Sequence, residues 1–95
     1  MIFEWDPTKA WRNVRKHKVS FEEAATVFLD PLATTFDDPD HSKAEHRYIT
    51  IGWSNQQRVL FVAHADRGVE RIRIITARQA TRREKHDYSE IRQRS

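Results

Sequence analysis

The segment formed by residues 71–84 constrains the fold of this chain more than any other. Ile72 and Ile74 alternate with Arg71 and Arg73. This period of two places apolar side chains on one face of a β-sheet and cations on the other. The isoleucines can be buried only if the arginines are not. The segment therefore predicts a strand that packs against a core on one side and carries positive charge on the other.

The same segment changes its period after residue 76, which predicts a turn followed by a helix. Thr81 and Glu84 have the spacing of a capping box, in which the threonine hydroxyl accepts an early helical N–H and the glutamate reaches back. Arg78 falls in the predicted turn, and Arg82 and Arg83 fall at the helix start. A helix N-terminus favours anions through its free N–H groups and its dipole. Arginines are poorly placed there unless an anion binds, so the sequence predicts a phosphate site.

The length of the chain predicts one domain, residues 1–95, with one modest core. Cysteine is absent, which excludes disulfides and cysteine-ligated zinc. No apolar run approaches the roughly 20 residues that span a bilayer, and the N-terminus lacks a signal-peptide pattern. We therefore expect a cytoplasmic protein without a membrane partner.

Charge is distributed unevenly along the chain. The net charge is +3, but residues 71–95 hold eight basic against three acidic residues, and residues 30–45 hold five acidic against one basic. A basic end of this kind attracts nucleic acid or an acidic partner, or it is a charged helix that serves solubility. Seven of its eight basic residues are arginine, which favours bidentate recognition of phosphate.

The N-terminal half predicts a short strand and two helices. Residues 2–5 alternate as a strand, and the Asp-Pro pair that follows suits the start of a helix. Residues 20–23 form a second capping box, with Val19 placed to pack against Ala24 as a hydrophobic staple. A second helix should begin there. The expected apolar stripe of the first helix is Ala10, Trp11, Val14 and His17.

The C-terminal half predicts an antiparallel meander. Residues 32–36, 46–51 and 58–64 are β-prone and lead through polar loops to the strand at residue 71. A last helix should run from about residue 80 to residue 92, packing through Ala80, His86, Tyr88 and Ile91. The predicted fold class is α+β: a small single domain with an antiparallel β-sheet of about four strands, two N-terminal helices and one C-terminal helix.

The acidic loop at residues 37–46 contains residue types that bind metals. Its spacing matches no metal motif, and it lacks the glycine of a calcium loop. Only Gly52 and Gly68 are available for a phosphate cradle, so Walker-type and dinucleotide-binding loops are excluded. We expect no metal and no cofactor.

The remaining residue types suit metal-free cleavage of RNA. In that reaction a base takes the proton of a ribose 2′-hydroxyl, cations stabilise the phosphorane, and an acid protonates the leaving oxygen. The candidate bases are His64, His17 and Glu84. Each has a structural alternative: His64 as a hydrogen-bonded residue at a strand end, His17 as a helix terminator and Glu84 as a cap. The candidate charge stabilisers are Arg73, Arg78 and Arg82, which would surround one anion-sized site.

Several ordered motifs run along nearly the whole chain. They are Phe-Glu-Trp-Asp at residues 3–6, Arg-Lys-His at residues 15–17, Val-Ser-Phe-Glu-Glu-Ala at residues 19–24, and the two motifs at residues 73–78 and 80–84. Together they closely resemble the BrnT toxins of bacterial type II toxin–antitoxin systems.

The resemblance implies a compact RelE-like fold and a metal-independent endoribonuclease that arrests translation. It also implies neutralisation by a BrnA-type antitoxin with a ribbon-helix-helix DNA-binding part, so operator DNA would be bound only through the antitoxin. The alternative is a non-catalytic RNA- or DNA-binding module or a co-repressor. By motif position, the implied catalytic residues are Arg73, Arg78, Thr81 and Arg82, together with His64 and Glu84. The basic residues expected to contact RNA are Arg71, Arg83, Lys16 and His17.

One residue departs from the family pattern. Members often have glycine after the Lys-His pair, where this chain has Lys18. Glycine adopts the left-handed conformation that ends a helix more easily than any other residue. We therefore expect a local change in that turn without loss of the fold.

Overall fold

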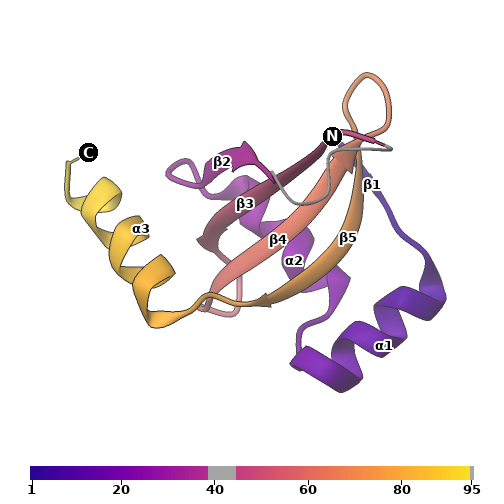
Figure 1. Cartoon of the computed structure of the whole chain (residues 1–95), viewed down its shortest axis with the longest axis horizontal. Helices are drawn as coiled ribbons and strands as arrows, with labels where there is room; N and C mark the ends of the chain where they lie inside the picture. Colours follow the sequence, from indigo (N-terminus) through magenta and orange to yellow (C-terminus); the bar gives the residue numbers. More distant parts are fainter. Residues whose placement is uncertain (39–44, 95) are drawn as a thin grey trace.

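The structure is a computed structural model that describes residues 1–38 and 45–94. In this part of the chain, five strands form one sheet with the order β1-β5-β4-β3-β2, and three α-helices surround it (Figure 1). The α+β class predicted from the sequence is confirmed. In chain order the elements are β1 (Ile2–Glu4), α1 (Pro7–His17), α2 (Phe21–Thr26), the 3-10 helix η1 (Val27–Leu29), β2 (Thr34–Asp37), β3 (Arg47–Trp53), β4 (Val59–Asp66), β5 (Arg71–Gln79) and α3 (Arg82–Arg94).

The sheet is mixed and not purely antiparallel. Strands β2 to β5 form the expected antiparallel meander. Strand β1 adds a fifth strand, parallel to β5, with Phe3 opposite Ile72. The sequence predicted this strand but not its partner, because no tight turn links a three-residue edge strand to a neighbour. Strand β1 covers only the first three residues of β5, so the rest of that edge of β5 faces α1.

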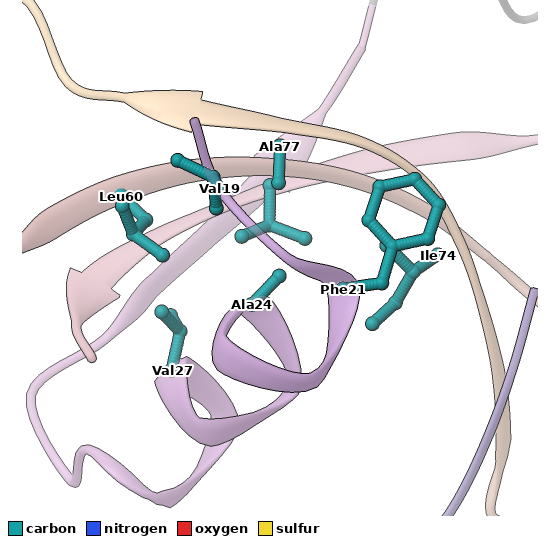
Figure 2. Close-up of a cluster of buried hydrophobic side chains, with 8 residues drawn as sticks. Val19, Phe21, Ala24, Val27, Leu60, Ile74 and Ala77 are labelled. Carbon is teal, nitrogen blue, oxygen red and sulfur yellow. The ribbon is translucent and has the colours of Figure 1, made fainter. Parts of the chain in front are cut away.

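The main core lies between the sheet and helix α2. Figure 2 shows Phe21, Ala24 and Val27 on the helical side, facing Leu60, Ile74 and Ala77 of the sheet. Val19 and Ala24 are both fully buried in this cluster, which confirms the predicted hydrophobic staple. We call this side of the sheet the covered face and the opposite side the open face.

Helix α1 packs mainly through a polar residue, and the predicted apolar stripe is only partly confirmed, because Ala10 packs against the core whereas Trp11 and Val14 do not. Trp11 and Val14 are 60% and 43% exposed, whereas Asn13 is buried. The Asn13 amide donates to the carbonyl oxygens of Val19 (2.9 Å) and Ala77 (2.8 Å). Its oxygen accepts from the Ala77 N–H (3.2 Å) and from the hydroxyl of Thr76 (3.1 Å). Asn13 therefore pairs with β5 as a neighbouring strand would, at an edge that otherwise leaves backbone groups unpaired.

The second capping box forms only in part. The Ser20 hydroxyl accepts from the Glu23 N–H (3.0 Å), as predicted. The Glu23 carboxylate, however, does not reach back to the cap. It accepts from Ser54 Oγ (2.6 Å) and from Arg58 Nε (3.0 Å). Burial alone would raise the pKa of this carboxyl, but the hydrogen bonds from Arg58 and Ser54 lower it below its ordinary value.

The turn after α1 keeps a left-handed cap although it lacks glycine. Lys18 itself adopts φ 60 and ψ 32, and its N–H donates to Val14 O at 2.9 Å. The expected local change in this turn is therefore wrong. The lysine adopts the conformation that glycine would adopt, with the steric strain that a β-carbon brings there.

Helix α3 is attached to the sheet mainly through Tyr88. This residue is 2% exposed and packs on Ile49 and Ile51, on the open face. Its hydroxyl donates to the carboxylate of Asp30. His86 is exposed and pairs with Glu90, so its predicted packing role is wrong. One tyrosine thus holds a helix that covers only one end of the open face.

Candidate functional site

A β-bulge in β5 sets the direction of Arg78. Ala63 pairs with Thr76 and His64 pairs with Ile74, so Ile75 is an extra residue without a partner in β4. Side chains alternate between faces along a strand, and one extra residue reverses the alternation beyond it. The bulge therefore allows Ala77 to be fully buried with Ile74 and brings Arg78 to the open face.

The change of period seen in the sequence is this bulge and not the end of the strand. Strand β5 continues to Gln79, and helix α3 begins at Arg82. The prediction that a turn supplies Arg78 is therefore wrong. A rigid strand supplies it, opposite Phe61 of β4.

Arg78, Thr81, Arg82 and Glu84 form what we call the β5–α3 corner. Arg78 makes a bidentate ion pair with Glu84, with Nη1–Oε1 and Nη2–Oε2 distances of 2.9 and 3.1 Å. The predicted capping box is present: Glu84 Oε1 accepts from the Thr81 N–H (2.8 Å), and Thr81 Oγ1 accepts from the Glu84 N–H (3.2 Å). The Arg78 guanidinium also lies 3.8 Å from the centre of the Phe61 ring. The strand, the turn and the helix thus fix Arg78 together.

The electrostatics of the corner follow from this pair. Hydrogen bonds from Arg78, aided by the Thr81 N–H, lower the pKa of the Glu84 carboxyl below its ordinary value. The negative charge of Glu84 offsets the positive charge of Arg78, which would otherwise be unfavourable beside the positive end of the helix dipole. Arg82 and Arg83 are exposed in the first helical turn, and neither takes part in an ion pair among the described residues. The corner therefore has spare positive charge beside free helical N–H groups.

Arg71 and Arg73 lie on the open face, as the alternation predicted. Arg71 is exposed and donates to Glu4 Oε1 at 3.3 Å, and Arg73 is half-buried. Arg73 is five residues from Arg78 along β5, or about 15 Å at the rise of a strand. It does not share one anion-sized site with Arg78, which corrects that expectation. The two arginines can instead contact separate phosphates of one chain.

The sequence did not reveal Arg47 as a candidate residue. It pairs in register with Ala65, and Ala65 pairs in turn with Arg73. These residues form a row across three strands of the open face, with the two arginines about 10 Å apart at ordinary strand spacing. The Arg47 Nε atom is buried without a hydrogen-bond partner among the described residues, and the Glu45 carboxylate lies 3.8 Å from it. The alternation of residues 46–51 could have revealed Arg47, because this alternation places it on the same sheet face as Ile49 and Ile51.

His64 does not join the other candidates. It lies on the covered face, 3% exposed, against the edge of the Phe28 ring and stacked on Tyr48. Its Nε2 hydrogen-bonds to Thr50 Oγ1 at 2.7 Å. Burial lowers the pKa of His64 to about 4, against a smaller opposing effect of Asp66. The sheet separates this imidazole from Arg78, so its expected role as a catalytic base is wrong, and it is a neutral core residue.

Lys16 and His17 lie in a groove of about 190 Å³ between helix α1 and strand β5. Burial, followed by the charges of Lys16 and Arg78, lowers the pKa of His17 below its ordinary value of 6.5. His17 lines this groove beside Ile75 and Thr76 of β5, the strand that carries Arg78. We call this the α1–β5 groove, and it is lined by Lys9, Arg12, Asn13, Lys16, His17, Ile75 and Thr76.

No group of three or more acidic, histidine or cysteine side chains that could hold a metal ion occurs within residues 1–38 and 45–94. Part of the acidic loop, including Asp40 and His41, lies outside the described residues. Within the described part, Asp37 pairs with His46 at 3.0 Å.

The fold and the corner define a class of protein: a small α+β domain with a mixed five-stranded sheet in the described residues and several arginines on its open face. A comparison with protein families matches residues 5–84 to the family described as the ribonuclease toxin BrnT of type II toxin–antitoxin systems. The match covers most of the chain, and the chain belongs to this family. Membership in a type II system implies a protein antitoxin as partner.

A solved structure agrees with this assignment. The chain is similar to the Brucella abortus ribonuclease toxin BrnT, known from a 1.1 Å crystal structure, with a TM-score of 0.65 and 25% sequence identity. The similarity covers 86% of this chain and all of the other. No curated protein sequence matches the chain.

None of the described helices is both long enough and apolar enough to cross a membrane.

Proposed function

We propose that this protein is an endoribonuclease that cleaves RNA without a metal ion, and that the β5–α3 corner is its active site. The observation that carries the proposal is the fixed guanidinium of Arg78 at the start of α3. It is held by Glu84 and Phe61 and remains 32% exposed. A preorganised donor of this kind stabilises the charge that develops on phosphate in the transition state.

The reaction begins at a ribose 2′-hydroxyl. A base accepts the proton of this hydroxyl, and its oxygen forms a bond to the adjacent phosphorus. The bond from phosphorus to the 5′-oxygen breaks, and that oxygen takes a proton from an acid. The products are a 2′,3′-cyclic phosphate and a 5′-hydroxyl end. Arg78 and Arg82, with the free N–H groups of the first turn of α3, would stabilise the doubly charged phosphorane.

Two groups can serve as the base at neutral pH: Glu84, which pairs with Arg78, and His17, which lines the adjoining groove. The pKa of Glu84 is lowered mainly by the hydrogen bonds from Arg78, and the pKa of His17 is lowered mainly by burial. Both groups are therefore deprotonated near pH 7 and able to accept a proton.

The test is incubation of the purified protein with RNA in excess EDTA, followed by analysis of the product ends. The proposal predicts cleavage with 5′-hydroxyl and 2′,3′-cyclic phosphate ends. Activity that disappears with the chelator would refute the metal-independent mechanism. Salt-sensitive binding of RNA without any product would favour a non-catalytic binding module or co-repressor instead.

We also propose that the antitoxin is of the BrnA type, with a ribbon-helix-helix part that binds operator DNA, and that the toxin acts on cytoplasmic RNA. Family membership supports this pairing. Co-expression with the protein encoded by the adjacent gene should yield a stable complex that binds operator DNA. The toxin alone should not bind that DNA specifically. Specific binding by the toxin alone would contradict the proposal.

A further inference from the structure

We propose that the α1–β5 groove is a second phosphate-binding site, which holds the backbone of single-stranded RNA beside the β5–α3 corner. This inference rests on the RNA substrate proposed above. The groove contributes three cations from one helix face: Lys9, Arg12 and Lys16. They follow one another at spacings of three and four residues, which align side chains along one side of a helix.

Within residues 1–38 and 45–94 these cations form no ion pair, although the charge of Lys9 helps to lower the pKa of the exposed Asp6 carboxyl, after the backbone hydrogen bonds that this carboxyl accepts. None of the ion pairs or side-chain hydrogen bonds of the described residues involves the charged end of Lys9, Arg12 or Lys16. Several other arginines do have acidic partners, as in Arg58 with Glu23 and Arg67 with Glu45. Like charges three or four residues apart on a helix repel one another. A cluster of like charges without ion pairs among the described residues is therefore suited to an external anion.

The chemistry of the groove fits a phosphate chain better than a peptide. Besides the cations and His17, its lining is the polar pair Asn13 and Thr76 and a single aliphatic side chain, Ile75. Asn13 uses its amide to bind β5, so it supplies no free recognition group. Cations that repeat along a helix at about 5 Å intervals match a ligand with regularly spaced charges. Backbone phosphates carry one such charge per nucleotide and need no sequence-specific contact.

The groove and the corner adjoin along β5, because Ile75 and Thr76 line the groove and Arg78 follows Thr76 by two residues on the same strand. The pKa of the His17 imidazole is lowered in part by Lys16 of the groove and by Arg78 of the corner. Asn13 meanwhile fixes α1 against Ala77, the residue before Arg78. One RNA strand that crosses the free edge of β5 can therefore contact both sites. The groove would hold the phosphates that flank the one at the corner.

The test measures binding of a 2′-O-methyl RNA oligonucleotide, which cannot be cleaved by 2′-hydroxyl attack. Fluorescence anisotropy gives its Kd over a series of salt concentrations. The groove variant is Lys9→Gln/Lys16→Gln. The matched control is Arg15→Gln/Lys18→Asn, which removes the same charge from the same helix outside the groove. Arg15 instead stacks on Trp11 at 4.7 Å. Asparagine tolerates the left-handed conformation of residue 18.

The groove variant should reduce the slope of log K against log salt by about 1.4, or about 0.7 per lost phosphate contact. Between about 50 and 200 mM salt, the wild type should then lose about sevenfold more affinity than the groove variant. The control should keep the wild-type slope. Equal slopes for the groove and control variants would overturn the inference. The same assay with labelled poly-glutamate tests for an acidic protein partner. A groove variant that binds poly-glutamate more weakly but binds RNA as the wild type does would also overturn the inference, because it would assign the groove to such a partner. If the groove variant shows the reduced slope and the control does not, but the wild-type protein cleaves no RNA, the groove is supported and the proposed cleavage is refuted.

Discussion

Replacement of Asn13 by alanine should be one of the most destabilising polar substitutions in this chain. Asn13 is 6% exposed and makes four hydrogen bonds, two as donor and two as acceptor. Truncation leaves three backbone groups without this partner: the carbonyl of Val19 and both the N–H and the carbonyl of Ala77. A buried polar group left unsatisfied costs about 1–3 kcal/mol. Because water can reach some of these groups once the side chain is removed, we expect a total loss on the order of 3 kcal/mol.

This loss would be large for a domain of this size, whose free energy of unfolding is about 5–15 kcal/mol. Urea denaturation followed by circular dichroism measures it, and the midpoint of thermal unfolding should fall by about 12–24 °C. Val14→Ala is the matched control, since Val14 is the next residue on α1 and is 43% exposed. The control should change stability by no more than about 0.5 kcal/mol. A loss below about 1 kcal/mol for Asn13→Ala would refute the role assigned to this amide.

Three further predictions concern pH and the helix cap. Burial lowers the pKa of His64 to about 4 in the folded protein. As the pH falls, His64 is therefore protonated in the unfolded chain at a higher pH than in the folded protein. Stability that is complete above pH 6.5 should therefore decrease toward pH 4 by on the order of 2 kcal/mol, and a His64→Gln variant should show a flatter profile in urea titrations at each pH. A wild type that is equally stable at both pH values would contradict this account. Lys18→Gly should raise the free energy of unfolding by about 0.5–1 kcal/mol because it relieves a strained left-handed residue; an unchanged or lower value would show that the strain is absent. The rate of RNA cleavage should stay level between about pH 7 and pH 8, because Glu84 and His17 both have lowered pKa values and are already deprotonated. A rate that rises steeply over this range would indicate a different base.

The sequence predicted the local features well because their signals are short-range. The capping box of Thr81 and Glu84 forms as expected, and the staple of Val19 and Ala24 is buried. The alternation at residues 71–74 correctly assigned the isoleucines to the core and the arginines to the open face. Each of these features depends on residues within a few positions of one another.

The errors involve contacts between distant segments. The partner of Glu23 is Arg58, and the partner of Asn13 is Ala77; neither spacing carries a local signal. The bulge at Ile75 looked like the end of a strand, because one extra residue disrupts the alternation as a turn would. His64 stayed a candidate base in the sequence analysis because the residues that bury it, such as Phe28 and Tyr48, come from other elements of the chain. The spacing of Lys9, Arg12 and Lys16 is a local signal for one basic helix face, but the groove that this face forms with Ile75 and Thr76 became visible only once α1 was placed beside β5.

The most direct test of the proposed active site compares the cleavage rates of Arg78→Ala and Arg67→Ala. Each variant loses one arginine that pairs with a glutamate, but Arg67 pairs with Glu45 and lies outside the corner. Thermal unfolding confirms that each variant is folded, and Arg78→Lys keeps the charge without the bidentate geometry. We expect Arg78→Ala to lower the cleavage rate by about 10²–10³, Arg78→Lys to have an intermediate rate, and Arg67→Ala to cleave at the wild-type rate. A folded Arg78→Ala variant that cleaves RNA as fast as Arg67→Ala would contradict this prediction.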